Sequence, residues 1–257
     1  MKDGLLVVDL GNSHLVAGVY DGEELIASWR LPTPRNQTVD EVRLRVDSLL
    51  RLDGIDREGL SAVIVASVVP PVTKVLCTGL RRLLGLEPLV VAPGIKTGMR
   101  LLYDHPEEIG ADRIVNSIAA HAEVDGPVVA VDFGTATTFD CVAANGDYLG
   151  GVIAPGLGIS AEALFSSASR LPRVEIRRPE RVIGKTTIQA MQAGIFHGYV
   201  GLVDGILDKV LEEMPEGCRV IATGGLAHRV AEASHHVAKV MPELTLLGLR
   251  LLHERNR

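Results

Sequence analysis

Cysteine is scarce in this chain, and the three that occur lie far apart. Cys77, Cys141 and Cys218 show no C-x-x-C spacing, so the sequence predicts neither a disulfide framework nor a zinc site. This pattern is typical of a reducing compartment, and we expect a cytoplasmic location. The eight histidines include the pair His235-His236 but form no H-E-x-x-H motif, so no tight metal site is expected.

Long apolar runs and an excess of positive charge are also missing. Charged residues or glycine interrupt every apolar run before it reaches the roughly 18 to 20 residues of a membrane span. The residues after Met1 show neither the basic region nor the apolar core of a secretion signal. The net charge of −6 argues against broad nucleic-acid binding, which needs clustered Lys and Arg. We therefore expect a small-molecule substrate, no membrane contact and no nucleic acid.

What the chain does contain is enough apolar sequence for a substantial core. Of its 257 residues 47% are hydrophobic and 23% are charged, a balance typical of globular proteins. The length favours one large domain or two small lobes. Two lobes are the working prediction.

The order of predicted elements in the first half is a meander followed by alternating strands and helices. Three short strands are predicted over residues 5–9, 16–20 and 25–29, then a helix over 39–50, a strand over 63–68, a helix over 72–84 and a strand over 89–91. Turns at Gly11-Asn12-Ser13 and Asp21-Gly22 connect the first three strands, which indicates an antiparallel meander.

The second half repeats this order, which predicts a duplication. Strands are predicted over 128–132, 137–142 and 147–153, with a later strand over 220–222 and a long helix over 189–211. We expect an α/β fold of two lobes, residues 1–116 and 117–257. The boundary falls inside a helix predicted as continuous over 107–122.

Two carboxylate–glycine hairpins occupy matching positions in the halves. Asp9-x-Gly11-Asn12-Ser13 ends the first strand, and Asp132-x-Gly134-Thr135 ends its counterpart. Glycine lets backbone N–H groups approach a phosphate while the carboxylate faces its metal. A single motif of this kind is more often an ordinary turn, but the repeat favours two phosphate loops across a cleft. The turn Thr223-Gly224-Gly225 is a third candidate, for which a plain strand-to-helix turn is an equal alternative.

These residues carry a resemblance to the superfamily of acetate and sugar kinases, heat-shock chaperones and actin. That resemblance implies two duplicated ribonuclease-H-like lobes of the actin-like ATPase class, with a cleft between them. Within the superfamily, nearly the whole chain is similar to type III pantothenate kinases. The motifs that carry this similarity are Asp9 to Ser13, Ser67-Val-Val-Pro70, Gly110-Ala-Asp-Arg113, Asp132 to Thr138, and Gly184-Lys-Thr-Thr187 with Gly194.

The resemblance implies a function and a role for each motif. The expected reaction is ATP-dependent phosphorylation of pantothenate to 4′-phosphopantothenate, the first step towards coenzyme A, by a homodimer that uses ATP with Mg²⁺ and a monovalent cation, K⁺ or NH₄⁺. ATP would contact Asp9, Leu10, Gly11, Asn12, Ser13, His14, Leu15, Val16 and Thr135, and Asp132 would hold the monovalent cation. Pantothenate would contact Tyr103, Gly110, Ala111, Asp112, Arg113 and, in a dimeric site, Thr187. Asp112 would be the general base.

Three positions depart from the commonest pattern of the family. Ser13 stands where Thr is usual, His105 where Asn is common and Thr186 where Asp is frequent. Ser13 keeps a hydroxyl. The other two lie beside proposed substrate contacts, so they bear on the shape of the pantothenate pocket more than on the reaction class.

Other functions compete with this prediction. Gly184-Lys185-Thr186 resembles the end of a P-loop, but Pro179 replaces the first glycine and lacks an N–H. Gly156-x-Gly158-x-x-Ala161 resembles a dinucleotide fingerprint, but its strand is predicted to belong to a hairpin. A local ion pair is the alternative for Gly110–Arg113. A non-catalytic nucleotide-binding regulator of the same family and a small-sugar kinase of the same superfamily remain as alternative functions.

Overall fold

The computed structural model describes residues 3–34 and 36–257, and the chain divides into two compact units. Unit 1 combines the segment that ends at Gly98 with His105–Ala119 and Leu244–Arg257. Unit 2 combines Met99–Asp104 with Ala120–Glu243. The expected lobes, 1–116 and 117–257, stay a prediction. The units differ from them in three segments: Met99–Asp104, which contains Tyr103, residues 117–119, and Leu244–Arg257.

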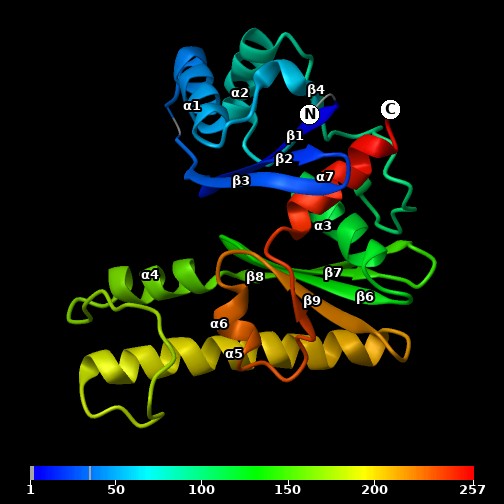
Figure 1. Cartoon of the computed structure of the whole chain (residues 1–257). Helices are drawn as coiled ribbons and strands as arrows, with labels where there is room; N and C mark the ends of the chain where they lie inside the picture. The colour runs from blue at the N-terminus through cyan, green and yellow to red at the C-terminus, as the bar shows by residue number, and fades with distance from the viewer. Residues whose placement is uncertain (1–2, 35) are drawn as a thin grey trace. The chain divides into compact units, whose positions relative to one another are not determined.

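Unit 1 is built on a five-stranded mixed sheet of order β3-β2-β1-β4-β5 (Figure 1). Its strands are β1 (Gly4–Leu10), β2 (His14–Asp21), β3 (Glu24–Pro32), β4 (Leu60–Ser67) and β5 (Leu89–Val90), and its helices are α1 (Val39–Leu52), α2 (Pro70–Leu84), most of α3 (Ala111–Ala122) and α7 (Leu244–Glu254), with short 3-10 helices η1 (Arg57–Gly59) and η2 (Pro106–Glu108). β1, β2 and β3 form the predicted antiparallel meander, whereas β1, β4 and β5 run parallel.

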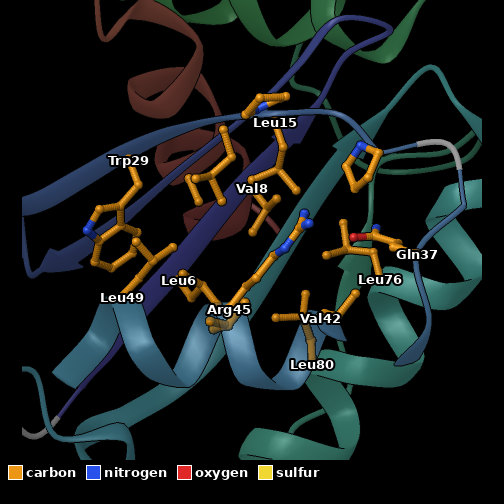
Figure 2. Close-up of a pocket in the computed structure, with 15 residues that line it drawn as sticks. Leu6, Val8, Leu15, Trp29, Gln37, Val42, Arg45, Leu49, Leu76 and Leu80 are labelled. Carbon is orange, nitrogen blue, oxygen red and sulfur yellow. The ribbon is translucent and has the colours of Figure 1, made fainter. Parts of the chain in front are cut away.

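The helices α1 and α2 cover one face of this sheet because their apolar faces match that of β1. Thr38 and Glu41 form a capping box that begins α1, and Val42 is buried against the alternate residues Leu6 and Val8 of β1. Figure 2 shows the layer between α1 and the sheet, where the side chain of Arg45 lies across a narrow apolar pocket. The free space there is about 30 Å³ for a water-sized sphere, so side chains fill most of the layer.

Unit 2 repeats the strand order on a second five-stranded sheet, β10-β9-β6-β7-β8. Its strands are β6 (Val128–Phe133), β7 (Ala136–Val142), β8 (Tyr148–Pro155), β9 (Arg219–Thr223) and β10 (Lys239–Val240), and its helices are α4 (Leu157–Ser167), α5 (Thr187–Glu213) and α6 (Ala227–Ala231). β6, β7 and β8 are antiparallel, and β6, β9 and β10 are parallel. The strands correspond one for one with those of unit 1 in order and direction, which confirms the predicted duplication, although two helices, α4 and α5, take the place of α1.

The long helix α5 runs along one face of the unit 2 sheet (Figure 1). It closes the core there with one apolar stripe. Tyr199, Val203 and Leu207 recur at a spacing of four residues and pack against Val129 and Val131 of β6. These side chains are almost completely buried. β6 is therefore fixed on both edges and on one face, which holds the turn after it in place.

The prediction of a continuous helix over 107–122 was wrong. The structure has η2 at Pro106–Glu108, an extended residue at Ile109, and α3 beginning at Ala111. The carbonyl of Gly110 accepts the backbone N–H of Ile114, so Gly110 stands at the beginning of the helix. Apolar spacing continues across this break and concealed it. The correction matters because it moves the predicted base from a helix interior to the first turn of α3.

Candidate active site

The first candidate loop joins β1 to β2 and is closed by its own backbone. The N–H of Gly11 donates to the carbonyl of His14 at 2.9 Å, and the Thr33 hydroxyl donates to the carbonyl of Gly11 at 2.7 Å. Asn12 and Ser13 are exposed at the tip. Thr33 was not singled out in the sequence, although its position directly after β3 places it beside the β1–β2 turn.

The predicted ATP contacts Asp9 to Val16 do not all offer side chains to a ligand. Leu10 is fully buried in the core, and Leu15 lines the apolar pocket on the α1 side of the sheet. Contacts from these two positions would have to come from the backbone. The exposed side chain of His14 lies 3.3 Å from Arg30, and partial burial together with this cation lowers its pKa. His14 is therefore neutral at physiological pH.

Three motifs meet at the carboxyl ends of the parallel strands β1 and β4. The N–H of Val68 donates to the carbonyl of Leu10 at 3.2 Å, which joins the Ser67–Pro70 motif to the end of β1. A Cβ built on Gly110 would lie 3.7 Å from the Val68 side chain, so the Gly110–Arg113 motif is adjacent as well. The carboxyl ends of parallel strands are the usual place for ligands in α/β sheets.

The Ser67–Pro70 motif holds the start of α2 through its serine. Its hydroxyl accepts the N–H of Val69 at 3.0 Å and lies 2.6 Å from the hydroxyl of Thr73. Pro70 occupies the first turn, where a missing N–H costs nothing. The motif therefore fixes the chain beside Gly110 rather than supplying a reactive group.

Asp112 is the only acidic side chain in the first turn of α3. Its Oδ1 accepts the N–H of Arg113 at 2.8 Å, and a Cβ on Gly110 would lie 2.5 Å from the same oxygen. Burial raises the pKa of Asp112, and the N–H and the charge of Arg113 oppose that shift only in part. A carboxylate with a raised pKa and one oxygen already anchored can accept a proton with the other.

The second candidate loop joins β6 to β7 and carries Asp132 and Thr135. The N–H of Gly134 donates to the carbonyl of Ala136 at 3.1 Å. The N–H of Gly156 donates to the carbonyl of Thr135 at 3.2 Å. A Cβ on Gly156 would collide with the carbonyl of Thr135. The backbone at position 156 lies so close to this loop that only glycine fits there. Because β8 is antiparallel to β7, no dinucleotide-binding βαβ unit begins here.

The turn after β9 lies directly against Asp132. Gly224 has φ +93°, and a Cβ there would lie 2.5 Å from Oδ1 of Asp132. Only glycine adopts this backbone conformation without strain and leaves room for the carboxylate. The Thr223-Gly224-Gly225 motif therefore belongs to the same loop cluster as Asp132 and Gly134. The motif spacing alone could not establish this adjacency.

The remaining predicted substrate residues, Tyr103 and Thr187, also belong to unit 2. The ring of Tyr103 lies 6.2 Å from that of Tyr148, at 58° between planes. Thr187 is the first residue of α5 and lines an apolar groove of about 510 Å³ between α4 and α5. Asp112 and Arg113 lie in unit 1.

Asp132 is the residue that the resemblance assigns to a monovalent cation. Among residues 3–34 and 36–257, no three His, Cys, Asp or Glu side chains cluster as metal ligands. A single carboxylate beside the backbone of Gly134 and Gly224 suits a large, weakly hydrated cation or a metal that arrives with phosphate oxygens. Within the same part of the chain, no helix is long and apolar enough to cross a bilayer.

Comparison with known proteins decides the family. The model of the type III pantothenate kinase family matches residues 5–209. The chain belongs to this family. The type III pantothenate kinase of Geobacter sulfurreducens is 52% identical over 98% of this chain and 99% of its own length. That of Pelobacter propionicus is 52% identical over 98% of this chain and all of its own.

Solved structures agree on the fold. The activator of the 2-hydroxyisocaproyl-CoA dehydratase from Clostridium difficile, solved with bound ADPNP, covers 98% of this chain and 96% of its own with a TM-score of 0.55 at 12% identity. At that identity the likeness concerns the fold alone. The fold is α/β with two mixed sheets and belongs to the actin-like ATPase class, as the sequence resemblance predicted.

Proposed function

We propose that this chain transfers the γ-phosphoryl group of ATP to the primary hydroxyl of pantothenate, giving 4′-phosphopantothenate and ADP. This is the first step of coenzyme A biosynthesis. The observation that carries the proposal is the position of Asp112, a carboxyl of raised pKa placed beside the carboxyl ends of β1 and β4 in a member of the type III pantothenate kinase family.

Asp112 acts as the general base in this proposal. Its oxygen that is not anchored by the N–H of Arg113 accepts the hydroxyl proton as the oxygen–phosphorus bond forms and the bond to ADP breaks. Gly110, Ala111, Arg113 and Tyr103 bind the acceptor. The arginine suits the carboxylate of pantothenate, because a guanidinium pairs with such a group through two hydrogen bonds.

The two hairpin loops bind the nucleotide. Backbone N–H groups between Asp9 and Val16 approach the phosphates, and the Ser13 hydroxyl replaces the usual threonine without loss of a donor. Thr135 is a further nucleotide contact. Asp132 would hold a monovalent cation, K⁺ or NH₄⁺, while Mg²⁺ accompanies ATP. Bound cations supply charge neutralisation for the transferring phosphoryl group.

Direct product detection tests the reaction. The purified chain is incubated with ATP, Mg²⁺ and K⁺ and, separately, with pantothenate, glucose or N-acetylglucosamine, and products are identified by mass spectrometry. We expect one added phosphoryl group on pantothenate alone. Phosphorylation of a sugar instead would support the small-sugar kinase, and nucleotide binding without any phosphorylated product would support the regulator.

We also propose a homodimer that forms through unit 2. Large apolar side chains are exposed there on β8, on α4 and around the start of α5: Ile153, Ile159, Leu164, Val182, Ile183 and Ile188. Four glycines of α5 have open space where a side chain would be: Gly194, Gly198, Gly201 and Gly205. Exposed apolar area next to a helix without bulky side chains favours close packing of a second copy. Thr187 lies within this region.

Light scattering of paired variants tests the dimer. Ile188→Glu places a charge on the proposed interface, whereas Leu52→Glu makes the same change at an exposed leucine at the end of α1 in unit 1. We expect the wild type and Leu52→Glu to have the mass of two chains and Ile188→Glu to dissociate. A fully active monomer at micromolar concentration would contradict the proposal.

A cytoplasmic location completes the proposal. ATP, the proposed donor, is a cytoplasmic metabolite, and the three cysteines are free thiols, which suits a reducing compartment. Fractionation of cells that express the tagged chain would test it.

A further inference from the structure

Strand β7 presents different chemistry on its two faces. Thr137 and Phe139 face the core formed with α5, where the hydroxyls of Thr137 and Tyr199 are hydrogen-bonded. Thr138 and Asp140 alternate with them and therefore lie on the opposite face. This alternation places the carboxyl of Asp140 on the second face of β7, at a buried position where an apolar side chain would be expected.

Asp140 is completely buried, and its carboxyl accepts hydrogen bonds from two neighbours. The Tyr148 hydroxyl donates to Oδ1 at 2.9 Å, and the Thr138 hydroxyl donates to Oδ2 at 3.2 Å. Burial of a carboxyl costs free energy that hydrogen bonds or a paired charge must offset. A core of purely structural purpose is more simply made with an apolar residue, so this carboxyl calls for a functional explanation.

Tyr148 connects this carboxyl to the segment that carries Tyr103. Its N–H donates to the carbonyl of Arg100 at 2.9 Å, and its carbonyl accepts the N–H of Leu102 at 2.8 Å. Its ring also contacts that of Tyr103. A Cβ on Gly150 would lie 3.8 Å from the Tyr103 ring, so the backbone of β8 supports the ring as well.

We propose that Asp140 and Tyr148 are positioning residues that hold the ring of Tyr103 in place for the acceptor substrate. The inference rests on the proposed role of Tyr103 in pantothenate binding. Asp140 fixes the hydroxyl end of Tyr148, and the fixed ring and backbone of Tyr148 then set the place of Tyr103. Neither residue needs to touch the substrate, and neither was named in the motifs that carry the family resemblance.

Steady-state kinetics of Tyr148→Phe and Asp140→Asn tests the inference. Tyr148→Phe keeps the ring and removes only the hydroxyl, so we expect it to fold, which its melting curve checks. We expect the KM for pantothenate to rise about tenfold, the effect of one lost buried hydrogen bond, with kcat and the KM for ATP within about twofold of wild type. Asp140→Asn should act in the same direction.

Tyr199→Phe is the matched control on the other face of β7. It also removes a buried tyrosine hydroxyl that bonds to a threonine of the same strand. We expect it to lower the melting temperature and to leave the KM for pantothenate unchanged. A general loss of stability in unit 2 would instead raise the KM in both tyrosine variants, and that result would overturn the inference.

A double-mutant cycle separates action through Tyr103 from any other route. In a Tyr103→Ala background, Tyr148→Phe should no longer change the KM for pantothenate, because the group it positions is gone. Two results would overturn the inference: an unchanged effect of Tyr148→Phe on the KM for pantothenate in the Tyr103→Ala background, or a wild-type KM in Tyr148→Phe alone. In either case, turnover of pantothenate by the wild type would still support the proposed function. A wild type that does not phosphorylate pantothenate would reject both.

Discussion

The two hairpin loops are copies of one structure that have acquired different contacts. In each, a carboxylate two residues before a glycine lies at the end of a central strand, and the strand pairs antiparallel with the next and parallel with a later one. Asp9 is opposite Val16 in the first copy, and Asp132 is opposite Thr138 in the second. The scaffold therefore fixes where each carboxylate lies but not what it contacts.

The two copies differ in the turn after the parallel neighbour of the central strand. After β4, Ser67 and Pro70 begin α2 and place the chain beside Gly110, so helix α3, which carries Asp112, borders the first loop. After β9, Gly224 lies against Asp132 itself. The first loop thus lies near the proposed base Asp112, whereas in the second copy the backbone at Gly224 lies against Asp132. Divergence of the flanking turns after a duplication would let one fold carry the base chemistry proposed for Asp112 and the cation proposed at Asp132.

The largest expected effect is that of removing the proposed base, Asp112, beside the first loop. Asp112→Asn keeps the shape of the side chain, and we expect kcat to fall by roughly 10²- to 10⁴-fold with little change in ATP affinity. Asp47→Asn, which breaks an ion pair with Arg51 on α1 of the same unit, is the control and should keep wild-type turnover. A folded Asp112→Asn with near wild-type kcat would remove Asp112 from the role of base.

A second test fills the space beside the carboxylate of the other copy. Gly224→Ala places a methyl group 2.5 Å from Asp132, and we expect turnover to fall by at least about tenfold. Gly217→Ala is the matched control, because Gly217 also has positive φ but nothing lies near its Cβ position. Both variants should lose about 1–2 kcal/mol of unfolding free energy from the backbone. Equal turnover in the two variants would show that the contact with Asp132 is unimportant.

The repeated elements could be predicted from the sequence, but the contacts between turns could not. Short, nearly continuous apolar runs bounded by turn residues located β1, β2 and β6 within a residue or two, since local patterning decides them. The break before α3 was missed because apolar spacing continues across Gly110. The approach of Gly224 to Asp132 depends on parallel pairing of strands distant in sequence, which no local pattern encodes.

Asp140 illustrates the same limit at the candidate site. Its position in the strand could be read from the alternation of β7, but its partner Tyr148 is reached only through the register of β7 with β8. That register includes an irregularity between Cys141 and Val142, which shifts the pairing near Tyr148. Counting residues around the Asn145-Gly146 turn would therefore misplace the pair.

A third test asks whether the second copy holds a monovalent cation. We expect turnover to be several-fold higher in K⁺ or NH₄⁺ than in Na⁺, because one carboxylate among backbone groups suits a large, weakly hydrated ion. Asp132→Asn should lower the rate in K⁺ and abolish the difference between the salts. Equal wild-type rates in sodium and potassium at matched ionic strength would leave Asp132 with a magnesium or structural role.

The smallest expected effect is on the pH dependence of stability, and it concerns Asp112 beside the first loop. Burial raises the pKa of Asp112 in the folded protein, so the folded state holds this proton more tightly than the unfolded state. Stability from this group is therefore present at low pH and is lost as the pH rises through the folded pKa. Asp112→Asn has no such proton to lose.

Melting temperatures measured from about pH 4 to about pH 8 should reveal this difference. Relative to wild type, Asp112→Asn should be more stable at the upper end of the range than at the lower end, and the Asp47→Asn control should not show that trend. The same raised pKa should place the acidic limb of kcat/KM above the ordinary aspartate value of 3.8, since the base must be deprotonated to work. If the Asp112→Asn and wild-type melting curves stay parallel across the range, burial does not penalise the charged carboxylate, and the argument for Asp112 as a tuned base fails with it.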